Sequence, residues 1–121
     1  TTIGRIITSN RLEDKEEIHN KLGDLFHKVK CVRNVDEFML IPDGVDKGLA
    51  TRMCMQYLNI DIEKTIVIGD GENDLDLFEN PGFKIAVANA NDKLKNLANQ
   101  VTSLPASSGV REIIHKLKEN N

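Results

Sequence analysis

The sequence predicts an α/β protein with a parallel β-sheet and helices on both faces, and two observations lead to this fold class. Beyond residue 43, stretches with apolar residues at helical spacing alternate with short runs of β-branched and apolar residues. One such run, residues 65–68, leads straight into a turn rich in glycine and aspartate and then into another helical pattern. This alternation is typical of parallel strands joined by right-handed helical crossovers.

The amino-terminal region is predicted to form a strand, a helix and one or two further strands. β-Branched residues dominate residues 3–8, and residues 11–29 place their apolar side chains on one helical face. Residues 31–41 are expected to form either one strand or a hairpin of two. This order suits an open α/β layer with the helix on one of its faces.

A turn at Pro42-Asp43-Gly44 marks the expected hinge, which divides the chain into domains of residues 1–42 and 43–121. Beyond it we expect a helix, a strand, a helix, a strand, a helix, a short strand and a helix, over residues 47–58, 65–68, 75–78, 85–87, 91–99, 101–104 and 108–117. Ser108 is expected to cap the last of these helices.

Two carboxylates stand in the turn Gly69-Asp70-Gly71-Glu72-Asn73-Asp74. In a parallel sheet this turn lies at the carboxyl ends of the strands, where ligands bind. Asp70 and Asp74 have no neighbouring cation within the loop, so they suit a hard divalent ion such as Mg²⁺. A solvated turn is the alternative, because glycine, aspartate and asparagine also favour turns for conformational reasons.

Lys47 lies at the start of the helix that precedes this strand and loop. A cation is disfavoured near the positive end of a helix dipole, so its position makes more sense if the ammonium group faces an anion. A helix amino terminus, a fixed ammonium group and a metal held by carboxylates together describe a phosphate site. The alternative is a surface lysine without a specific role.

These two motifs resemble those of a known family. Asp46-Lys47-Gly48, followed by the loop from Gly69 to Asp74, resembles the third and fourth motifs of the haloacid dehalogenase phosphatases. The closest resemblance is to the subgroup with a large α/β cap, which includes archaeal phosphoglycolate phosphatase and the Cof-type enzymes. It extends over about residues 45–117 and implies half of a Rossmann-like parallel sheet, preceded by the last strand–helix–strand part of the cap.

The resemblance implies hydrolysis of small phosphomonoesters through an aspartyl-phosphate, with 2-phosphoglycolate as the best candidate substrate. Asp70 would ligate Mg²⁺, and Asp74 would either ligate it directly or hold a coordinating water. Lys47 would be catalytic: it would orient the nucleophile and neutralise phosphoryl oxygens. Asn73 would bind a phosphoryl oxygen of the substrate or fix the loop.

The nucleophile of this family is the first aspartate of an Asp-x-Asp motif that ends a strand, and no such strand occurs in the sequence. Asp74-Leu75-Asp76 has the right letters but begins a helix. We therefore expect the chain to be the carboxyl-terminal half of an enzyme, inactive alone, that requires the amino-terminal half or self-association. The alternative is a non-catalytic fragment, or a metal- or phosphate-binding module that acts only with a partner chain.

Composition excludes several other classes of function. The net charge of −3 and the absence of a basic stripe argue against binding to nucleic acid or to an anionic membrane. No apolar run is as long as a membrane span or signal peptide, so we expect a cytoplasmic protein. The cysteines, Cys31 and Cys54, are far apart and are expected to be reduced, buried thiols.

Overall fold

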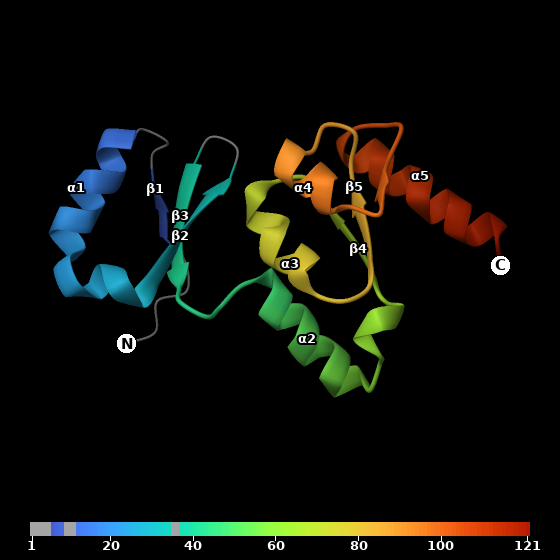
Figure 1. The fold of residues 1–121 in the computed structure, drawn as a ribbon, viewed down its shortest axis with the longest axis horizontal. Helices are drawn as coiled ribbons and strands as arrows, with labels where there is room; N and C mark the ends of the chain where they lie inside the picture. The colour runs from blue at the N-terminus through green and yellow to red at the C-terminus, as the bar shows by residue number, and fades with distance from the viewer. Residues whose placement is uncertain (1–5, 9–11, 35–36) are drawn as a thin grey trace. The chain divides into compact units, whose positions relative to one another are not determined.

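The computed structural model describes residues 6–8, 12–34 and 37–121, which form two compact units (Figure 1). The units comprise Thr1–Asp46 and Lys47–Asn121. They therefore divide between residues 46 and 47, whereas the sequence predicted a boundary between residues 42 and 43. Assignment of the first unit to a cap stays a prediction.

The first unit contains a three-stranded antiparallel sheet in the order β1-β3-β2. Its strands and helices are β1 (Ile6–Thr8), α1 (Leu12–Leu22), a 3₁₀ helix (Gly23–Lys28), β2 (Val29–Asn34) and β3 (Glu37–Pro42). Pairing of Val29 with Pro42 and of Asn34 with Glu37 confirms the hairpin. The predicted helix over residues 11–29 is too long, because the chain takes a left-handed conformation at Gly23, with φ of 51°. The predicted strand residues 3–5 lie outside the described part of the chain.

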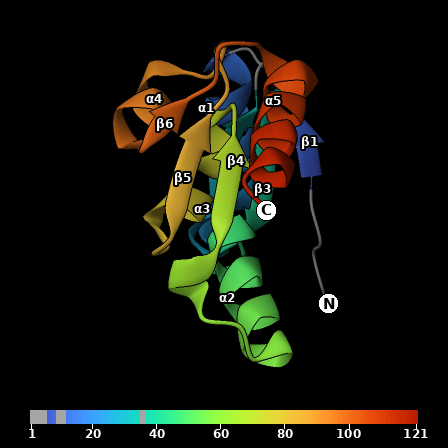
Figure 2. The same ribbon diagram turned by 90° about the vertical axis from the view of Figure 1, so that its right-hand side faces the viewer.

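The second unit contains a parallel sheet in the order β4-β5-β6, as the alternating pattern predicted. The elements are α2 (Lys47–Leu58), a 3₁₀ helix (Ile62–Lys64), β4 (Ile66–Gly69), a 3₁₀ helix (Glu72–Asp74), α3 (Leu75–Glu79), β5 (Phe83–Ala86), α4 (Asp92–Leu97), β6 (Gln100–Val101) and α5 (Ala106–Glu119). Helix α3 lies on one face of the sheet and α5 on the opposite face, as Figure 1 and Figure 2 show. The predicted fold class is therefore confirmed.

A cluster of buried side chains from the sheet and the helices beside it forms the core of this unit. Its members are Val67, Phe78, Ala86, Val87, Ala90 and Leu94. The core fixes the carboxyl ends of β4 and β5 side by side, and the N–H of Val87 donates to the carbonyl of Gly69 there, at 3.2 Å. The loops that follow these two strands consequently meet at one edge of the sheet.

The last helix begins earlier than predicted and is capped differently. Helix α5 starts at Ala106, so Ser108 lies in its first turn and is not the cap. The side chain of Asn89 instead accepts a hydrogen bond from the N–H of Ala106, at 2.8 Å. The predicted strand over residues 101–104 is also shorter, because β6 ends at Val101.

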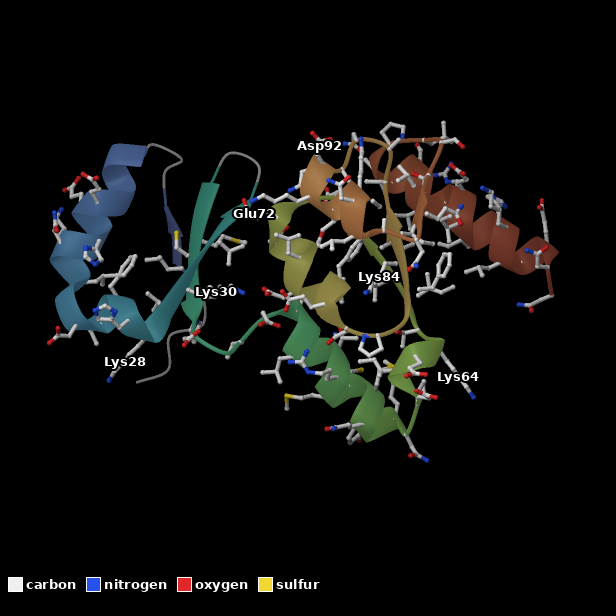
Figure 3. All side chains as sticks on the ribbon, in the orientation of Figure 1. Lys28, Lys30, Lys64, Glu72, Lys84 and Asp92 are labelled. Carbon is white, nitrogen blue, oxygen red and sulfur yellow. The ribbon has the colours of Figure 1, made fainter. Side chains whose placement is uncertain are left out.

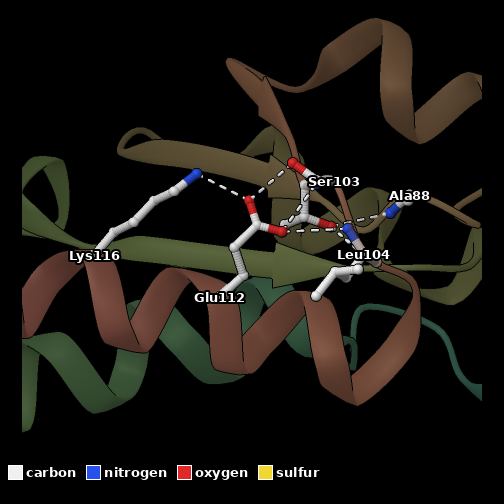
Figure 4. A network of polar contacts seen from close by, with 6 residues as sticks. Ala88, Ser103, Leu104, Glu112 and Lys116 are labelled. Carbon is white, nitrogen blue, oxygen red and sulfur yellow. Dashed lines mark hydrogen bonds and ion pairs between the residues drawn. The ribbon is translucent and has the colours of Figure 1, made fainter.

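The loop between β6 and α5 is held by the carboxylate of Glu112 (Figure 4). Glu112 Oε2 accepts from the N–H groups of Ser103 and Leu104, at 2.9 and 3.2 Å, and Oε1 accepts from Lys116 Nζ at 2.9 Å. The buried Thr102 hydroxyl donates to the Leu104 carbonyl at 2.6 Å and accepts from the N–H of Ala88 at 3.1 Å. These contacts tie the loop before α5 to the turn after β5.

Apolar surface remains exposed on the second unit. Within the described residues β4 pairs only with β5, so its other edge has no strand partner. Ile66 of β4 is 42% exposed, and on α2 the side chains of Met53 and Tyr57 are 60% and 90% exposed. Cys54, on the same helix, is exposed and Cys31 is half-buried, whereas both were expected to be buried, and neither forms a disulfide within the described residues. Among the described helices, none has the length and apolar character needed to cross a membrane.

Replacing Glu112 with glutamine should lower the thermal stability of the chain near neutral pH. The hydrogen bond from Lys116, with those from the backbone of Ser103 and Leu104, holds the pKa of Glu112 below its usual value. Stabilisation by a carboxylate with a lowered pKa is complete above its unfolded-state pKa, about 4.3, and is lost as the pH falls through the folded-state value. Melting curves of the wild type and Glu112→Gln should therefore converge as the pH falls below the unfolded-state pKa.

Glu119→Gln, a change in the last turn of the same helix, serves as the control and should show no such pH-dependent difference. A Glu112→Gln melting temperature equal to that of the wild type at pH 7 would contradict the role assigned to the Glu112 contacts.

Candidate functional site

Three of the four predicted site residues line one cavity at the carboxyl end of β4. Lys47, Asp70 and Asp74 surround a space of about 210 Å³, all of it within the second unit. The remaining lining residues are Ile68, Gly69, Val87, Ala106 and Val110. Asn73, the fourth predicted residue, is not among them. Lys47 comes from the first turn of α2 and the two aspartates from the loop after β4, so residues distant in sequence converge here.

Asp74 lies at the centre of this arrangement and is only 5% exposed. Its Oδ1 accepts a hydrogen bond from Lys47 Nζ, which also makes an ion pair with it. Its Oδ2 accepts from the N–H of Asp70 at 2.9 Å and from that of Gly71 at 3.4 Å. Burial by itself would raise the pKa of the Asp74 carboxyl, but these hydrogen bonds and the Lys47 charge outweigh burial and lower it. Asp74 therefore carries a negative charge that fixes the loop.

The tight loop requires glycine at residue 69 and leaves little room for a side chain at residue 71. A Cβ atom on Gly69 would lie 2.9 Å from Asp74 Cβ and 3.0 Å from Asp74 Oδ2, closer than real side chains approach. A Cβ atom on Gly71 would lie 2.9 Å from Asn73 Oδ1. The glycines before and after Asp70 thus make room for the side chains of Asp74 and Asn73, a reason that local turn preference does not supply.

Asp70 differs sharply from Asp74, although the two lie four residues apart in sequence. It is exposed, and no hydrogen bond or ion pair joins its carboxylate to any residue that the structure describes. Its backbone is nevertheless fixed, because its N–H donates to Asp74 and its carbonyl accepts from the N–H of Asn91 at 3.0 Å. The loop therefore presents a free carboxylate on an anchored main chain.

Glu72 and Asn73 lie between the two aspartates, in the 3₁₀ helix that ends at Asp74. Asn73 Oδ1 is buried and has no hydrogen-bond partner within the described part of the chain. A buried amide oxygen without a partner is costly and indicates a missing ligand or a neighbouring group that would satisfy it. Glu72, labelled in Figure 3, makes an ion pair with Lys93 at 3.8 Å.

The donor set of this loop fits a magnesium ion only in part. Over the described residues there is no group of three or more His, Cys, Asp or Glu side chains that could hold a metal. Mg²⁺ commonly binds through one or two carboxylates together with waters and a substrate phosphate. The free carboxylate of Asp70, with the unpartnered oxygen of Asn73 nearby in sequence, meets that smaller requirement.

Sequence reasoning missed two residues that shape the site. Ala106 lines the cavity and has a left-handed conformation, with φ of 47°, which no local pattern signals. Asn80 is 3% exposed and binds the carbonyl of Gly48 in α2 through its side chain, which no local pattern signals. Asn89, in the turn after β5, holds the start of α5, because its side-chain Oδ1 accepts a hydrogen bond from the N–H of Ala106 at 2.8 Å.

Comparison with known proteins identifies relatives over most of the chain. A family model described as haloacid dehalogenase-like hydrolase matches residues 1–114. A phosphoglycolate phosphatase of Archaeoglobus fulgidus is 40% identical over 89 residues, which cover 74% of this chain and 40% of that protein. Phosphoglycolate phosphatase 2 of Saccharolobus solfataricus is 34% identical over 125 aligned positions, covering 99% of this chain and 50% of that protein.

The fold also matches solved structures. The crystal structure of a haloacid dehalogenase-like hydrolase from Bacteroides thetaiotaomicron has a TM-score of 0.77 and 25% identity, over 96% of this chain and 44% of that one. The chain thus spans no more than half the length of each of these three relatives.

Truncating the two aspartates should separate their roles. Asp74→Ala removes the partner of Lys47 and leaves the N–H groups of Asp70 and Gly71 unsatisfied, so we expect it to destabilise the fold by about 2–4 kcal/mol. Asp70→Ala removes an exposed, unbonded carboxylate and should change stability by less than about 0.5 kcal/mol. Urea unfolding measures both values, and equal losses in the two variants would refute the assignment of Asp74 as the structural carboxylate.

Proposed function

The chain belongs to the haloacid dehalogenase-like hydrolase family, as its motifs predicted, and on that premise we propose that the whole protein is a Mg²⁺-dependent phosphomonoesterase of small metabolites. Two of the relatives are named phosphoglycolate phosphatase, so 2-phosphoglycolate is the substrate we propose first. Because the chain spans at most half of those proteins, this activity is proposed for the complete enzyme. A cytoplasmic location stays a prediction from the sequence.

One observation carries the proposal: a lysine ammonium group and a free carboxylate line the same cavity at the carboxyl edge of a parallel sheet. Lys47 stands in the first turn of α2, and Asp70 follows β4. Hydrolysis of a phosphate monoester requires that negative charge be neutralised before an anionic nucleophile can approach. A cation and a metal-binding carboxylate on one cavity wall meet that requirement.

Each residue then has a distinct task. Asp70 holds Mg²⁺, which would neutralise phosphoryl charge when bound. Lys47 orients the nucleophile and binds phosphoryl oxygens, since its side chain remains 53% exposed while it pairs with Asp74. Asn73 binds a phosphoryl oxygen through its amide or fixes the loop. Both oxygens of Asp74 already accept hydrogen bonds, which favours a water-mediated over a direct contact with the metal.

The nucleophile must come from another segment, and the free edge of β4 suggests where. This edge lies beside the acidic loop and has no strand partner in the described residues. We propose that a strand ending in the family's Asp-x-Asp motif pairs with β4 there, supplied by an amino-terminal segment or a companion chain. Such pairing would also cover the exposed side chain of Ile66.

Asp70→Asn should abolish turnover in the complete enzyme and weaken Mg²⁺ binding in this chain. The amide is isosteric but carries no charge, so a hard cation loses its principal ligand. Phosphate release from 2-phosphoglycolate at saturating Mg²⁺ measures the first effect, and calorimetric titration with Mg²⁺ measures the second. Glu72→Gln, in the same loop, is the matched control and should retain both. Wild-type turnover by Asp70→Asn would overturn the metal assignment.

Lys47→Met should reduce kcat by about a hundredfold or more, on the scale of one lost charge-stabilising contact in a catalytic site. Methionine keeps most of the apolar length of lysine but has no charge. The rate is measured with the complete enzyme and 2-phosphoglycolate. A variant with unchanged kcat would remove Lys47 from the proposed chemistry.

The second candidate function is a metal- or phosphate-binding module that acts only with a partner chain, which the incomplete set of carboxylates favours. A denaturing mass spectrum of the phosphatase-tested sample distinguishes the two. Phosphate release together with a second polypeptide carrying Asp-x-Asp supports the enzyme. A single polypeptide that binds Mg²⁺ without releasing phosphate supports the module.

A further inference from the structure

Asn80 is one of the few buried polar residues of the second unit, and its side chain joins two helices. It follows α3 directly and is 3% exposed. Its Nδ2 donates to the carbonyl of Gly48 at 2.9 Å, and its Oδ1 accepts from Arg52 Nη1 at 2.6 Å. Both partners belong to α2, so one amide contacts this helix twice, at Gly48 in its first turn and at Arg52 in its second.

The chemistry of these contacts requires an asparagine. A backbone carbonyl can only accept a hydrogen bond and a guanidinium group can only donate one, so a single amide orientation satisfies both. An aspartate at this position would place a carboxylate oxygen against the Gly48 carbonyl. An apolar residue would make neither the hydrogen bond from Arg52 nor the one to the carbonyl of Gly48.

These contacts stand one residue away from the proposed catalytic lysine. Gly48 is buried and follows Lys47, whose long side chain is half-exposed and pairs with Asp74. A lysine side chain has several rotatable bonds, so the position of its ammonium group depends on how firmly its backbone is held. Fixing Gly48 fixes the point from which the Lys47 side chain extends.

Asn80 and Asp74 also belong to one rigid segment. They flank α3 (Leu75–Glu79), Asp74 immediately before it and Asn80 immediately after it. A five-residue helix is about 7.5 Å long. Helix α2 is therefore attached to this segment at two points: through Lys47 at the Asp74 end, and through Gly48 and Arg52 at the Asn80 end. Two attachments restrain rotation of α2 in a way that one flexible ion pair does not.

We propose that Asn80 is a positioning residue that holds the start of α2 so that the Lys47 ammonium group stays at Asp74 and in the cavity. It touches neither the cavity nor a metal ligand. The catalytic importance of this positioning rests on the proposed function, but the positioning itself can be measured without turnover.

The test compares the acylation rate of Lys47 by an amine-reactive ester in the folded chain, without metal or substrate, by peptide mass spectrometry. Lys64 is the internal standard, because it is exposed and projects away from the 3₁₀ helix before β4 (Figure 3). An ammonium group held by a carboxylate reacts more slowly than a free one. In Asn80→Ala the ratio of Lys47 to Lys64 acylation should rise about two- to fivefold, the range expected for releasing a partly exposed ion pair.

Two further variants make the result decisive. Asn99→Ala removes another side-chain amide that binds backbone in the same unit, through the N–H of Lys84 at 2.8 Å, and should leave the ratio unchanged. Arg52→Met, at an exposed position, removes one of the two Asn80 contacts and should give a smaller rise. If circular dichroism shows that Asn80→Ala does not fold, the Arg52→Met result decides. An unchanged ratio in the folded variants, or an equal rise in Asn99→Ala, overturns the proposal.

Discussion

The buried carboxylate of Asp74 is the interaction on which the candidate site depends. A charge at 5% exposure must be paired and hydrogen-bonded, and Asp74 meets this need with one ammonium group and two backbone N–H groups. These contacts constrain the surrounding structure. The loop must curl around the carboxylate, and residue 69 must lack a side chain. Helix α2 must begin at a point from which the Lys47 ammonium group reaches Asp74. The exposed Asp70 carboxylate is a consequence of this arrangement.

The other buried polar residues of the described part of the chain, Asn80 and Thr102, hold segments that carry residues of the cavity lining. Asn80 holds the first turn of α2, which carries Lys47. Thr102 joins the turn after β5 to the loop before α5, and that loop leads to Ala106, which also lines the cavity. Asn80 and Thr102 each donate and accept a hydrogen bond through their side chains, as burial demands. The apolar core fixes the position of the sheet, while Asp74, Asn80 and Thr102 fix the loops at its carboxyl edge and the first turn of α2.

Local sequence patterns predicted the parallel sheet, the order of its helices and three residues that line the cavity. They succeeded because apolar periodicity and the acidic turn are encoded over a few residues. They failed where a distant group decides the outcome: Asn89, and not Ser108, binds the first N–H of α5, that of Ala106, from 17 residues earlier in the chain. A backbone reversal at Gly23 ends α1 early. Asn80 could not be recognised, because its partners lie 28 and 32 residues away.

The separations between bonded residues also order the steps of folding. The hydrogen bonds that curl the acidic loop join residues three and four apart, so closing them costs little chain entropy. The contacts of Lys47 and Asn80 with their partners span 27 to 32 residues and must await the docking of α2. We therefore expect the acidic loop to take shape first, and Lys47 to join it only when α2 docks.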